Sequence, residues 1–404
     1  MLYRERTLQR VVLKASDNFK IVLLTGMRQV GKTTFLHHIA SNERVYATLD
    51  NPRDLTLAKN ESDFFLQTYK PPVMIDEIQY APELFPYIKM LADSADIYGL
   101  VWLTGSQQFE LMKGVSESLA GRVVIINMLG FSVYERDGLG EQQKPFLPAF
   151  EQPSILKRRS LPDTYKIIWK GAYPEIVDKD DDQWTNFYSS YIKTYIERDV
   201  RHIANINNEQ DFVKFLSVVA ARTAQELNIA EIARDVGIAP NTAKAWLSIL
   251  ESSGIVYMLK PYFKNVSKRY IKRPKLYFMD TGLVAYLTSW NTSEALETGA
   301  MSGAIFETFV ISEIIKSYHH NGLFPALYYY RDNGQVEIDL LIEQNGKLYP
   351  IEIKKTSNPN KNDIAGFEKL ANYTDNVDYG ALICLTDKAR PLTARANAIS
   401  IWDI

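Results

Sequence analysis

One nine-residue stretch constrains the fold of this chain more than any other. Residues 26–34 read GMRQVGKTT, between the apolar run IVLL and the helical pattern FLHHIA. The spacing of Gly26, Gly31, Lys32 and Thr33 matches G-x(4)-G-K-[ST] between a predicted strand and a predicted helix, the context that makes this motif specific. Glycines let the backbone curl so that successive N–H groups point at phosphate oxygens. The stretch therefore predicts a phosphate-binding loop.

The loop also predicts roles for its side chains. Lys32 would reach the β- and γ-phosphates of ATP, and the Thr33 hydroxyl would ligate Mg²⁺. The expected nucleotide-binding residues are Gly26, Met27, Arg28, Gln29, Val30, Gly31, Lys32, Thr33 and Thr34. The plain alternative is a glycine-containing turn with a solvated lysine, which the complete motif in this context argues against.

An acidic pair follows a second apolar run, VMIDEIQ. Asp76 and Glu77 end this predicted strand at its carboxyl edge, where ligands lie in open parallel sheets. We expect Asp76 to hold the Mg²⁺ and Glu77 to polarise the attacking water, which makes both catalytic candidates together with Lys32. A solvated strand edge or a helix cap is the alternative.

Further candidates for the nucleotide site come from later segments. The strand VWLTGSQQ ends in Ser106, Gln107 and Gln108, and Ser106 is a candidate sensor of the γ-phosphate. Arg122, Arg198 and Arg201 are candidates for a charge-stabilising arginine acting in cis or from a neighbouring subunit. Each of them could equally be a surface arginine, and the sequence leaves assembly into a homo-oligomer open.

The length of 404 residues predicts several domains. Between residues 21 and 126 the apolar runs IVLL, RVYATLD, PVMID, GLVWLTGS and RVVIIN alternate with helical patterns, which indicates a parallel sheet covered on both faces. The fold class is therefore multi-domain α/β. We expect a phosphate-loop domain at 1–150, a helical lid at 151–210, a winged helix at 211–295 and a second α/β domain at 296–404.

Charge and composition restrict the kinds of partner. A net charge of −2 argues against a chain that coats polyanions, so any nucleic-acid site must be local. There is no signal-peptide pattern and no run long enough to span a bilayer, so we expect a cytoplasmic protein with no membrane partner. Cys384 lies alone in the strand-like run ALICL, and the five histidines lack zinc spacing.

The segment IAEIARDVGIAPNTAKAWLSILESSGIVY has the sequence pattern of a helix-turn-helix. Pro240 suits the first turn of the second helix. That helix buries Ala243, Trp246, Leu247 and Leu250 and leaves Asn241, Lys244 and Ser248 outward. The basic segment 260–275 follows, with Lys260, Lys264, Lys268, Arg269, Lys272, Arg273 and Lys275 among Tyr262, Phe263 and Tyr270. DNA binding by phosphate contacts and docking between domains are both open.

A hairpin near the C-terminus brings two carboxylates together. Asn345-Gly346 predicts a two-residue type I′ turn, which sets Asp339 opposite Glu352 and Glu337 opposite Lys354. Opposed Cβ atoms lie about 4.5–5.5 Å apart, so the two acids repel unless a cation or a proton lies between them.

A second Mg²⁺, or Mn²⁺, held by Asp339 and Glu352 is one interpretation of this hairpin, with Lys354 orienting a water. Glu307 and Glu313, on a helical segment upstream, could offer a third carboxylate. A cross-strand ion pair between Glu337 and Lys354, with the other acids solvated, is the alternative.

With these motifs assembled, the chain resembles the bacterial and archaeal ATPases of AAA family 14 that carry a C-terminal domain of unknown function 4143. The resemblance covers nearly the whole chain: GMRQVGKTT as Walker A, MIDEIQ as Walker B, LTGS, SLAGR, ERDV, YFMDTGL, GAIFETFV, YYRDNGQVEIDLLIE and YPIEIKK. It implies an AAA-type domain, a winged helix and a terminal domain similar to the PD-(D/E)XK nucleases. In that motif Asp339, Glu352 and Lys354 match the catalytic Asp and Glu-x-Lys. The chain lacks an obvious second-region arginine.

Three functions are compatible with these features. The first is a Mg²⁺-dependent ATPase whose nucleotide state controls a DNA-binding winged helix and a nuclease-like module. The second is a regulatory ATP-binding switch that binds nucleic acid or protein and cleaves nothing. The third, a nucleotide kinase, leaves the winged helix and the terminal domain without a purpose.

Overall fold

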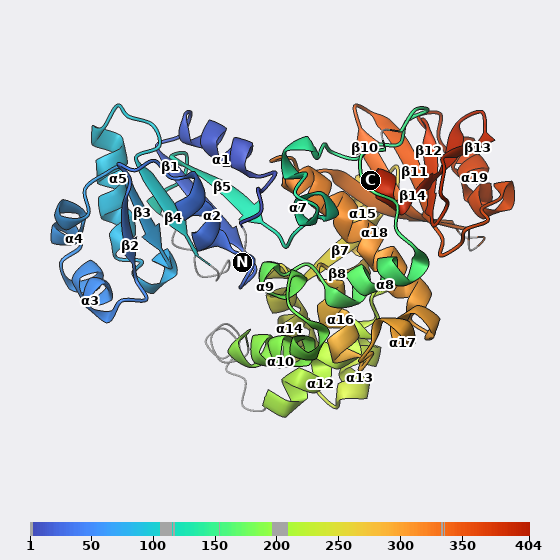
Figure 1. The fold of residues 1–404 in the computed structure, drawn as a ribbon, viewed down its shortest axis with the longest axis horizontal. Coiled ribbons are helices and arrows are strands. Elements are labelled where there is room, and N and C mark those ends of the chain that lie inside the picture. The colour runs from blue at the N-terminus through green and yellow to red at the C-terminus, as the bar shows by residue number, and fades with distance from the viewer. Residues whose placement is uncertain are drawn as a thin grey trace.

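Two β-sheets and a layer of helices make up the protein (Figure 1). The computed structural model describes residues 3–105, 115, 118–152, 154–195, 209–332, 334 and 336–404. The N-terminal sheet lies at one end of the molecule and the C-terminal sheet at the other. None of the helices in these ranges is long and apolar enough to cross a membrane.

The N-terminal sheet is the parallel sheet that the sequence predicts. Its order is β2-β3-β4-β1-β5, and every neighbouring pair is parallel. The strands are β1 (Ile21–Gly26), β2 (Val45–Thr48), β3 (Val73–Asp76), β4 (Val101–Thr104) and β5 (Val123–Met128). β1 is buried along its whole length. Its side chains alternate between two cores, with Val22 and Leu24 in one and Ile21 and Leu23 in the other.

Helices cover both faces of this sheet. Those supplying residues to its cores are α1 (Gln9–Ser16), α2 (Lys32–Ile39), α3 (Pro52–Asn60), α4 (Ser62–Thr68) and α5 (Leu84–Ser94). Val12 of α1 and Phe35 of α2 join one core, whereas Phe65 of α4 and Ile88 of α5 join the other. Burial on both faces explains why the strands are almost continuously apolar.

A set of helices follows the first sheet. It comprises α7 (Val133–Arg136), α8 (Leu161–Lys170), α9 (Pro174–Val177), α10 (Trp184–Tyr195), α12 (Glu209–Ala220), α13 (Ile229–Val236) and α14 (Pro240–Ser252). Gly237 ends α13 in the left-handed region at φ 89°, and Pro240 begins α14, as the sequence predicts. The expected burial also holds, since Ala243, Trp246, Leu247 and Leu250 are buried while Lys244 and Ser248 are exposed.

The second sheet has nine strands in the order β13-β14-β12-β11-β10-β9-β7-β8-β6. They are β6 (Gln225–Glu226), β7 (Val256–Pro261), β8 (Lys275–Phe278), β9 (Ala326–Arg331), β10 (Glu337–Gln344), β11 (Lys347–Ile353), β12 (Gly380–Cys384), β13 (Arg390–Thr393) and β14 (Ala396–Ser400). β7 pairs in parallel with β9 at Lys260↔Tyr328 and Pro261↔Tyr329. One sheet therefore crosses the division that the sequence suggests near residue 295.

The central helix of the C-terminal half is α18 (Ser302–His319), which is buried on nearly every side. α15 (Val266–Ile271), α16 (Thr281–Leu287), α17 (Ser293–Thr298) and α19 (Ala365–Tyr373) complete the helices of this half. The chain after β5 packs on α18, because Val133 N–H donates to Glu313 at 2.8 Å and Phe146 N–H donates to Ser317 at 3.0 Å. The Cys384 thiol on β12 is free and buried.

Candidate functional site

The phosphate-binding loop joins β1 to α2 in a conformation that favours glycine at two positions. Gly26 has φ 146°, and a Cβ there would lie 2.1 Å from the carbonyl oxygen of Met128 on β5. Gly31 caps α2 with φ 88°. The motif glycines therefore let the loop pass against the neighbouring strand and turn directly into the helix.

Lys32, Thr33 and Asp76 gather at this loop. Lys32 Nζ donates to the backbone oxygens of Gly26 at 3.0 Å and Met27 at 2.8 Å, and the residue is buried. Thr33 Oγ1 donates to Asp76 Oδ2 at 2.9 Å. The hydroxyl and the carboxylate predicted to serve Mg²⁺ are thus adjacent, and oxygen donors are the ligands this cation takes. This pair fits a magnesium site.

Glu77 follows Asp76 directly and turns away from the strand with φ 56°. Gln79 Nε2 donates to its carboxylate. Burial raises the pKa of Glu77, while the Gln79 hydrogen bond and the nearby Lys32 ammonium lower it in part. A carboxylate with a raised pKa beside a phosphate cradle has the character of a general base.

The structure brings one unpredicted side chain into this group and leaves Arg122 out. The hydroxyl of Tyr46, the second residue of β2, donates to Asp76 at 3.2 Å, a contact that depends on β2 pairing with β3. Arg122 instead forms a two-armed ion pair with Asp93 of α5. Ser106, Gln107, Gln108, Arg198 and Arg201 lie outside the described residues.

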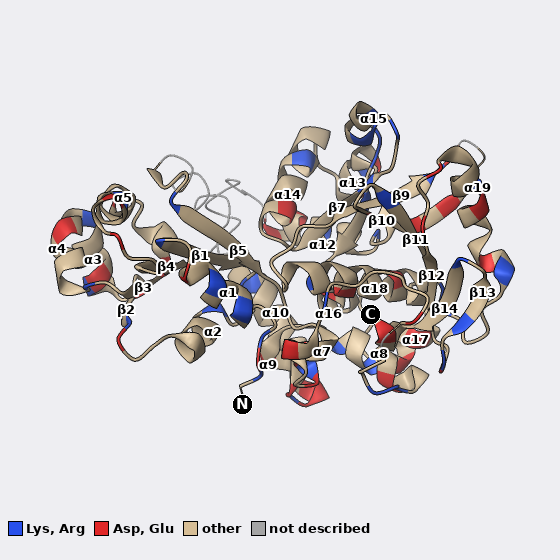
Figure 2. Ribbon diagram, turned by 90° about the horizontal axis from the view of Figure 1, so that it is seen from above, with Lys and Arg blue, Asp and Glu red and all other residues tan. Residues whose placement is uncertain are grey.

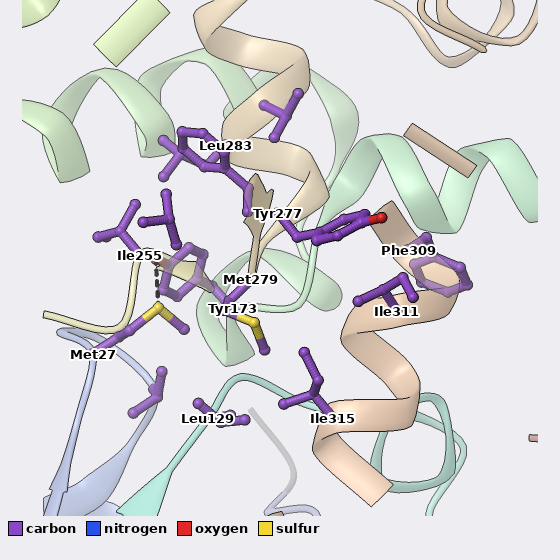
Figure 3. Packing of buried hydrophobic residues seen from close by; sticks show 14 of the residues in the cluster. Met27, Leu129, Tyr173, Ile255, Tyr277, Met279, Leu283, Phe309, Ile311 and Ile315 are labelled. Atoms are coloured by element: carbon purple, nitrogen blue, oxygen red, sulfur yellow. Dashed lines mark hydrogen bonds between the residues drawn. The ribbon is translucent and has the colours of Figure 1, made fainter. Parts of the chain in front are cut away.

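The loop also touches the helices that follow the sheet (Figure 3). Tyr173 OH donates to Met27 Sδ at 3.8 Å, and a Cβ on Gly254, in the turn between α14 and β7, would lie 3.3 Å from Met27 Cγ. Pro174, at the start of α9, is the nearest neighbour of Gly31 from outside the loop, its Cγ 3.8 Å from a Cβ built there. A change in the loop is therefore felt directly by α9 and by the α14–β7 turn.

A second group of charged side chains lies at the C-terminal hairpin. The predicted register is confirmed from Leu340↔Ile351 to Gln344↔Lys347, and Asn345 and Gly346 have φ 53° and 74°, as a type I′ turn requires. Beyond this regular ladder, the Asp339 side chain is a hydrogen-bond acceptor for the facing strand: Ile353 N–H donates to its carboxylate at 2.8 Å.

We use the name carboxylate cluster for Glu307, Glu337, Asp339 and Glu352. Asp339 and Glu352 are both largely buried. Burial, followed by the charge of Asp339, raises the pKa of Glu352 to about 8. The same two causes raise the pKa of Glu307 to about 7. The acids expected to repel each other are thus close enough to do so.

A buried cation of this cluster is Lys275 of β8, a residue that the sequence analysis placed in the basic segment 260–275. Its Nζ pairs with Glu337 and lies 3.5 Å from Glu307 and 3.8 Å from Asp339. The side chain is only 5% exposed. The three neighbouring carboxylates raise its pKa above the ordinary value despite the opposing effect of burial. Lys275 is therefore a buried, charged ammonium.

Two possibilities that the sequence left open at this hairpin do not occur. The cross-strand ion pair of Glu337 with Lys354 does not form, because Lys354 pairs with Glu352 at 2.8 Å and Glu337 pairs with Lys275. Glu313 lies elsewhere and pairs with Lys316 at 2.7 Å.

The carboxylate cluster does not fit a metal ion as it stands. Among the described residues, no three or more His, Cys, Asp or Glu side chains are arranged to hold one. The Lys275 ammonium lies 3.8 Å from Asp339, one of the two expected ligands, and 3.5 Å from Glu307, a candidate third carboxylate. The residues at this place therefore favour an internal cation over Mg²⁺ or Mn²⁺.

Comparison with known proteins shows the family to which the chain belongs. An uncharacterized protein of Mycobacterium tuberculosis is 31% identical over 362 residues, which cover 89% of this chain and 76% of that protein. Family models for an AAA domain, for domain of unknown function DUF8612 and for domain of unknown function DUF4143 match residues 18–136, 161–294 and 302–404. This chain belongs to the AAA–DUF4143 family. The order of the two named domains is the one that the sequence motifs indicate.

Other similarities are more distant. An uncharacterized protein of Methanocaldococcus jannaschii is 24% identical over 332 residues, covering 73% of this chain and 67% of that protein. Among solved structures, the Walker-type ATPase of Pyrococcus abyssi aligns with a TM-score of 0.45 at 15% identity over 71% of this chain and 96% of that one. Our assignment to the AAA–DUF4143 family rests on the family models and the mycobacterial relative.

The titration of the carboxylate cluster leads to a first prediction. The folded chain binds protons on Glu307 and Glu352 up to about pH 7 and 8, above the ordinary range of a glutamate. Between about pH 6.5 and 8.5 the folded state therefore holds more protons than the unfolded chain, so stability present at the lower pH is lost as pH rises. We expect the free energy of unfolding to fall by roughly 2 kcal/mol across this range.

Urea unfolding at the two pH values, in buffer with EDTA, measures this difference. Burial lowers the pKa of His319 to about 4 and that of His320 well below its usual value. Both histidines make the protein less stable as pH falls below about 6.5, so the measurement stays above that value. Glu352→Gln should remove most of the fall in the free energy of unfolding between these two pH values. Equal stability of the wild-type protein at both pH values would contradict the raised pKa values.

Proposed function

We propose that this protein is a Mg²⁺-dependent ATPase whose nucleotide state is transmitted to nucleic-acid-binding units downstream. The AAA-type P-loop domain supports ATP binding and hydrolysis. The observation that carries the proposal is the group formed by Lys32, Thr33 and Asp76 beside the glycine-defined loop.

Each residue of this group has a defined task in our proposal. The loop amides and Lys32 would hold the phosphates, since an ammonium that now donates to loop carbonyls can turn to phosphate oxygens. Thr33 and Asp76 would hold Mg²⁺, which neutralises charge on the β- and γ-phosphate oxygens when bound. Glu77 would accept a proton from the attacking water.

Transmission of the nucleotide state is supported by the contacts of Met27. This side chain lies in the loop itself, accepts a hydrogen bond from Tyr173 OH and lies close to Gly254 in the α14–β7 turn. A loop that rearranges around phosphate would displace Met27 and, through this turn, α14. The domain division of 1–150, 151–210, 211–295 and 296–404 belongs to this proposal, as do a cytoplasmic location and a homo-oligomeric state.

The downstream role that we favour is nucleic-acid binding without cleavage. α13, α14 and the β7–β8 pair have the order of a winged helix, which supports a DNA-binding unit. The resemblance to PD-(D/E)XK nucleases gives Asp339, Glu352 and Lys354 a catalytic role. The Lys275 ammonium in the carboxylate cluster argues against that role, and for a switch controlled by ATP.

Glu77→Gln tests the hydrolytic part of the proposal. The amide keeps the size of the side chain but accepts no proton, so kcat for ATP should fall about 100-fold. The Kd for a fluorescent ATP analogue should change by less than about 2-fold, because the loop and Lys32 are intact. Phosphate release measures kcat, and the fluorescence of the analogue measures Kd.

Glu83→Gln is the matched control, since Glu83 is exposed and lies six residues further along. Its turnover should equal that of the wild-type protein. Lost nucleotide binding in Glu77→Gln would make Glu77 a structural residue, and unchanged hydrolysis would remove it from the reaction altogether.

A further inference from the structure

We propose that single-stranded nucleic acid binds in a groove between α15 and strand β9, and that α14 is not the main contact surface. The groove has a volume of about 1080 Å³. Lys268, Lys272 and Arg273 line one side of it, and Tyr330 and Arg331 line the other. This inference rests on the nucleic-acid-binding part of the proposed function and names the site and the form of the ligand.

The groove contains cationic side chains that form no ion pair with any described residue. Lys268, Lys272 and Arg273 are exposed, and none of them is ion-paired with a described residue. Figure 2 shows basic residues on α15 and on the chain beside it. In a chain with a net charge of −2, three such neighbouring cations form a local site for phosphates.

Two acids also line the groove, and some of the cations nearby are already paired. Glu226 pairs with Arg331, whereas the Asp332 carboxylate accepts a hydrogen bond from Val336 N–H at 2.8 Å and keeps its negative charge. Arg269, which the sequence grouped with the basic residues, is buried between the rings of Tyr262 and Tyr328, 4.5 Å from each centroid. It pairs with Glu343 at 3.0 Å. Arg269 therefore holds the wall of the groove together.

Aromatic rings give the groove a second kind of contact. Tyr373 is 39% exposed, and Phe263 is partly exposed; both line the groove. Lys264 Nζ lies 5.0 Å from the Tyr373 ring centroid, so one part of that ring already meets a cation. Bases stack on such rings only when they are unpaired, since a duplex hides its base faces. Cations for phosphates and rings for bases together favour a single strand.

The outward face of α14 lacks the charge that duplex binding requires. Its exposed charged residues are Lys244 and Glu251, which cancel each other. Phosphate contacts supply most of the affinity of non-specific DNA binding. A helix without net charge contributes little of it, whereas the groove holds three cations that have no ion-pair partner among the described residues.

Fluorescence anisotropy with the full-length protein, MgATP and labelled oligothymidine of about 20 nucleotides tests the groove. Three phosphate contacts predict a slope of about −2 for log Kobs against log salt concentration. The triple variant Lys268→Ala, Lys272→Ala and Arg273→Ala should bind at least about 10-fold more weakly at about 100 mM salt, with a slope near zero. Tyr373→Ala should bind about 10-fold more weakly with an unchanged slope.

The control removes the same charge elsewhere. Lys369, Lys388 and Arg395 are exposed on the C-terminal unit, and their triple alanine variant should bind like the wild-type protein.

A groove variant with wild-type affinity would overturn the groove while leaving nucleic-acid binding intact. So would duplex that binds more tightly than the single strand and is lost in Lys244→Ala. Polyglutamate that competes equally would make the site one for acidic protein, and no binding of any oligonucleotide at low salt would remove the nucleic-acid part of the proposed function.

Discussion

Lys32→Ala is expected to lower kcat/KM for MgATP by about 1000-fold or more, because the ammonium is the charged group that the loop offers to the transferring phosphoryl group. In the structure this ammonium rests on the carbonyl oxygens of Gly26 and Met27, within the cradle that phosphate would enter. Steady-state phosphate release over a range of ATP concentrations measures the effect.

Lys59→Ala is the control for this change. Lys59 is exposed on α3 of the same domain, and its removal should leave turnover at the wild-type level. Because Lys32 also ties the loop together, thermal unfolding of the Lys32 variant should be followed in parallel. A folded Lys32→Ala protein that hydrolyses ATP within about 10-fold of the wild-type rate would refute the assignment of the loop.

Lys275→Met should destabilise the protein by about 3–5 kcal/mol, the range expected when one partner of a buried ion pair is removed. Methionine fills a similar volume, but Glu307, Glu337 and Asp339 are left without their shared cation. The loss should be larger at about pH 8.5 than at about pH 6.5, since Glu307, whose pKa is raised to about 7, can take up a proton at the lower pH. Urea unfolding at both values measures it.

Two variants separate charge from packing. Lys272→Met is three residues away and exposed, so it should change stability by less than about 0.5 kcal/mol. Adding Glu307→Gln to Lys275→Met should recover part of the loss, because one uncompensated charge is removed. If Lys275→Met loses less than about 1 kcal/mol, the ammonium does not hold the carboxylate cluster.

The parts of both sites that depend on local sequence could be predicted. The motif spacing fixed Lys32 and Thr33 at the start of α2, and Asp76 lies at the end of its strand as expected. The Asn345-Gly346 turn set the register of β10 and β11, because a two-residue turn leaves only one pairing. Short-range geometry determines these features, so each of them can be predicted from a single segment of the chain.

What the sequence could not supply depends on pairing between distant strands. Lys275 reaches the carboxylate cluster because β8 follows β7 into the sheet of the C-terminal unit, and nothing in the segment KRPK signals that neighbour. The basic composition around it favoured exposure. Tyr46 reaches Asp76 for a similar reason, since β2 and β3 are separated by two helices along the chain.

The parallel pairing of β7 with β9 has a mechanical consequence. Strands that share backbone hydrogen bonds cannot slide past each other without breaking the ladder, so the units on either side of residue 295 turn together as one block. Relative rotation is then left to the joint between the five-stranded sheet and this block, where Met27 meets Tyr173 and Phe131 N–H donates to Ala172 at 2.8 Å. Movement between that sheet and this block would have to change these contacts, and it would carry the groove along with the block.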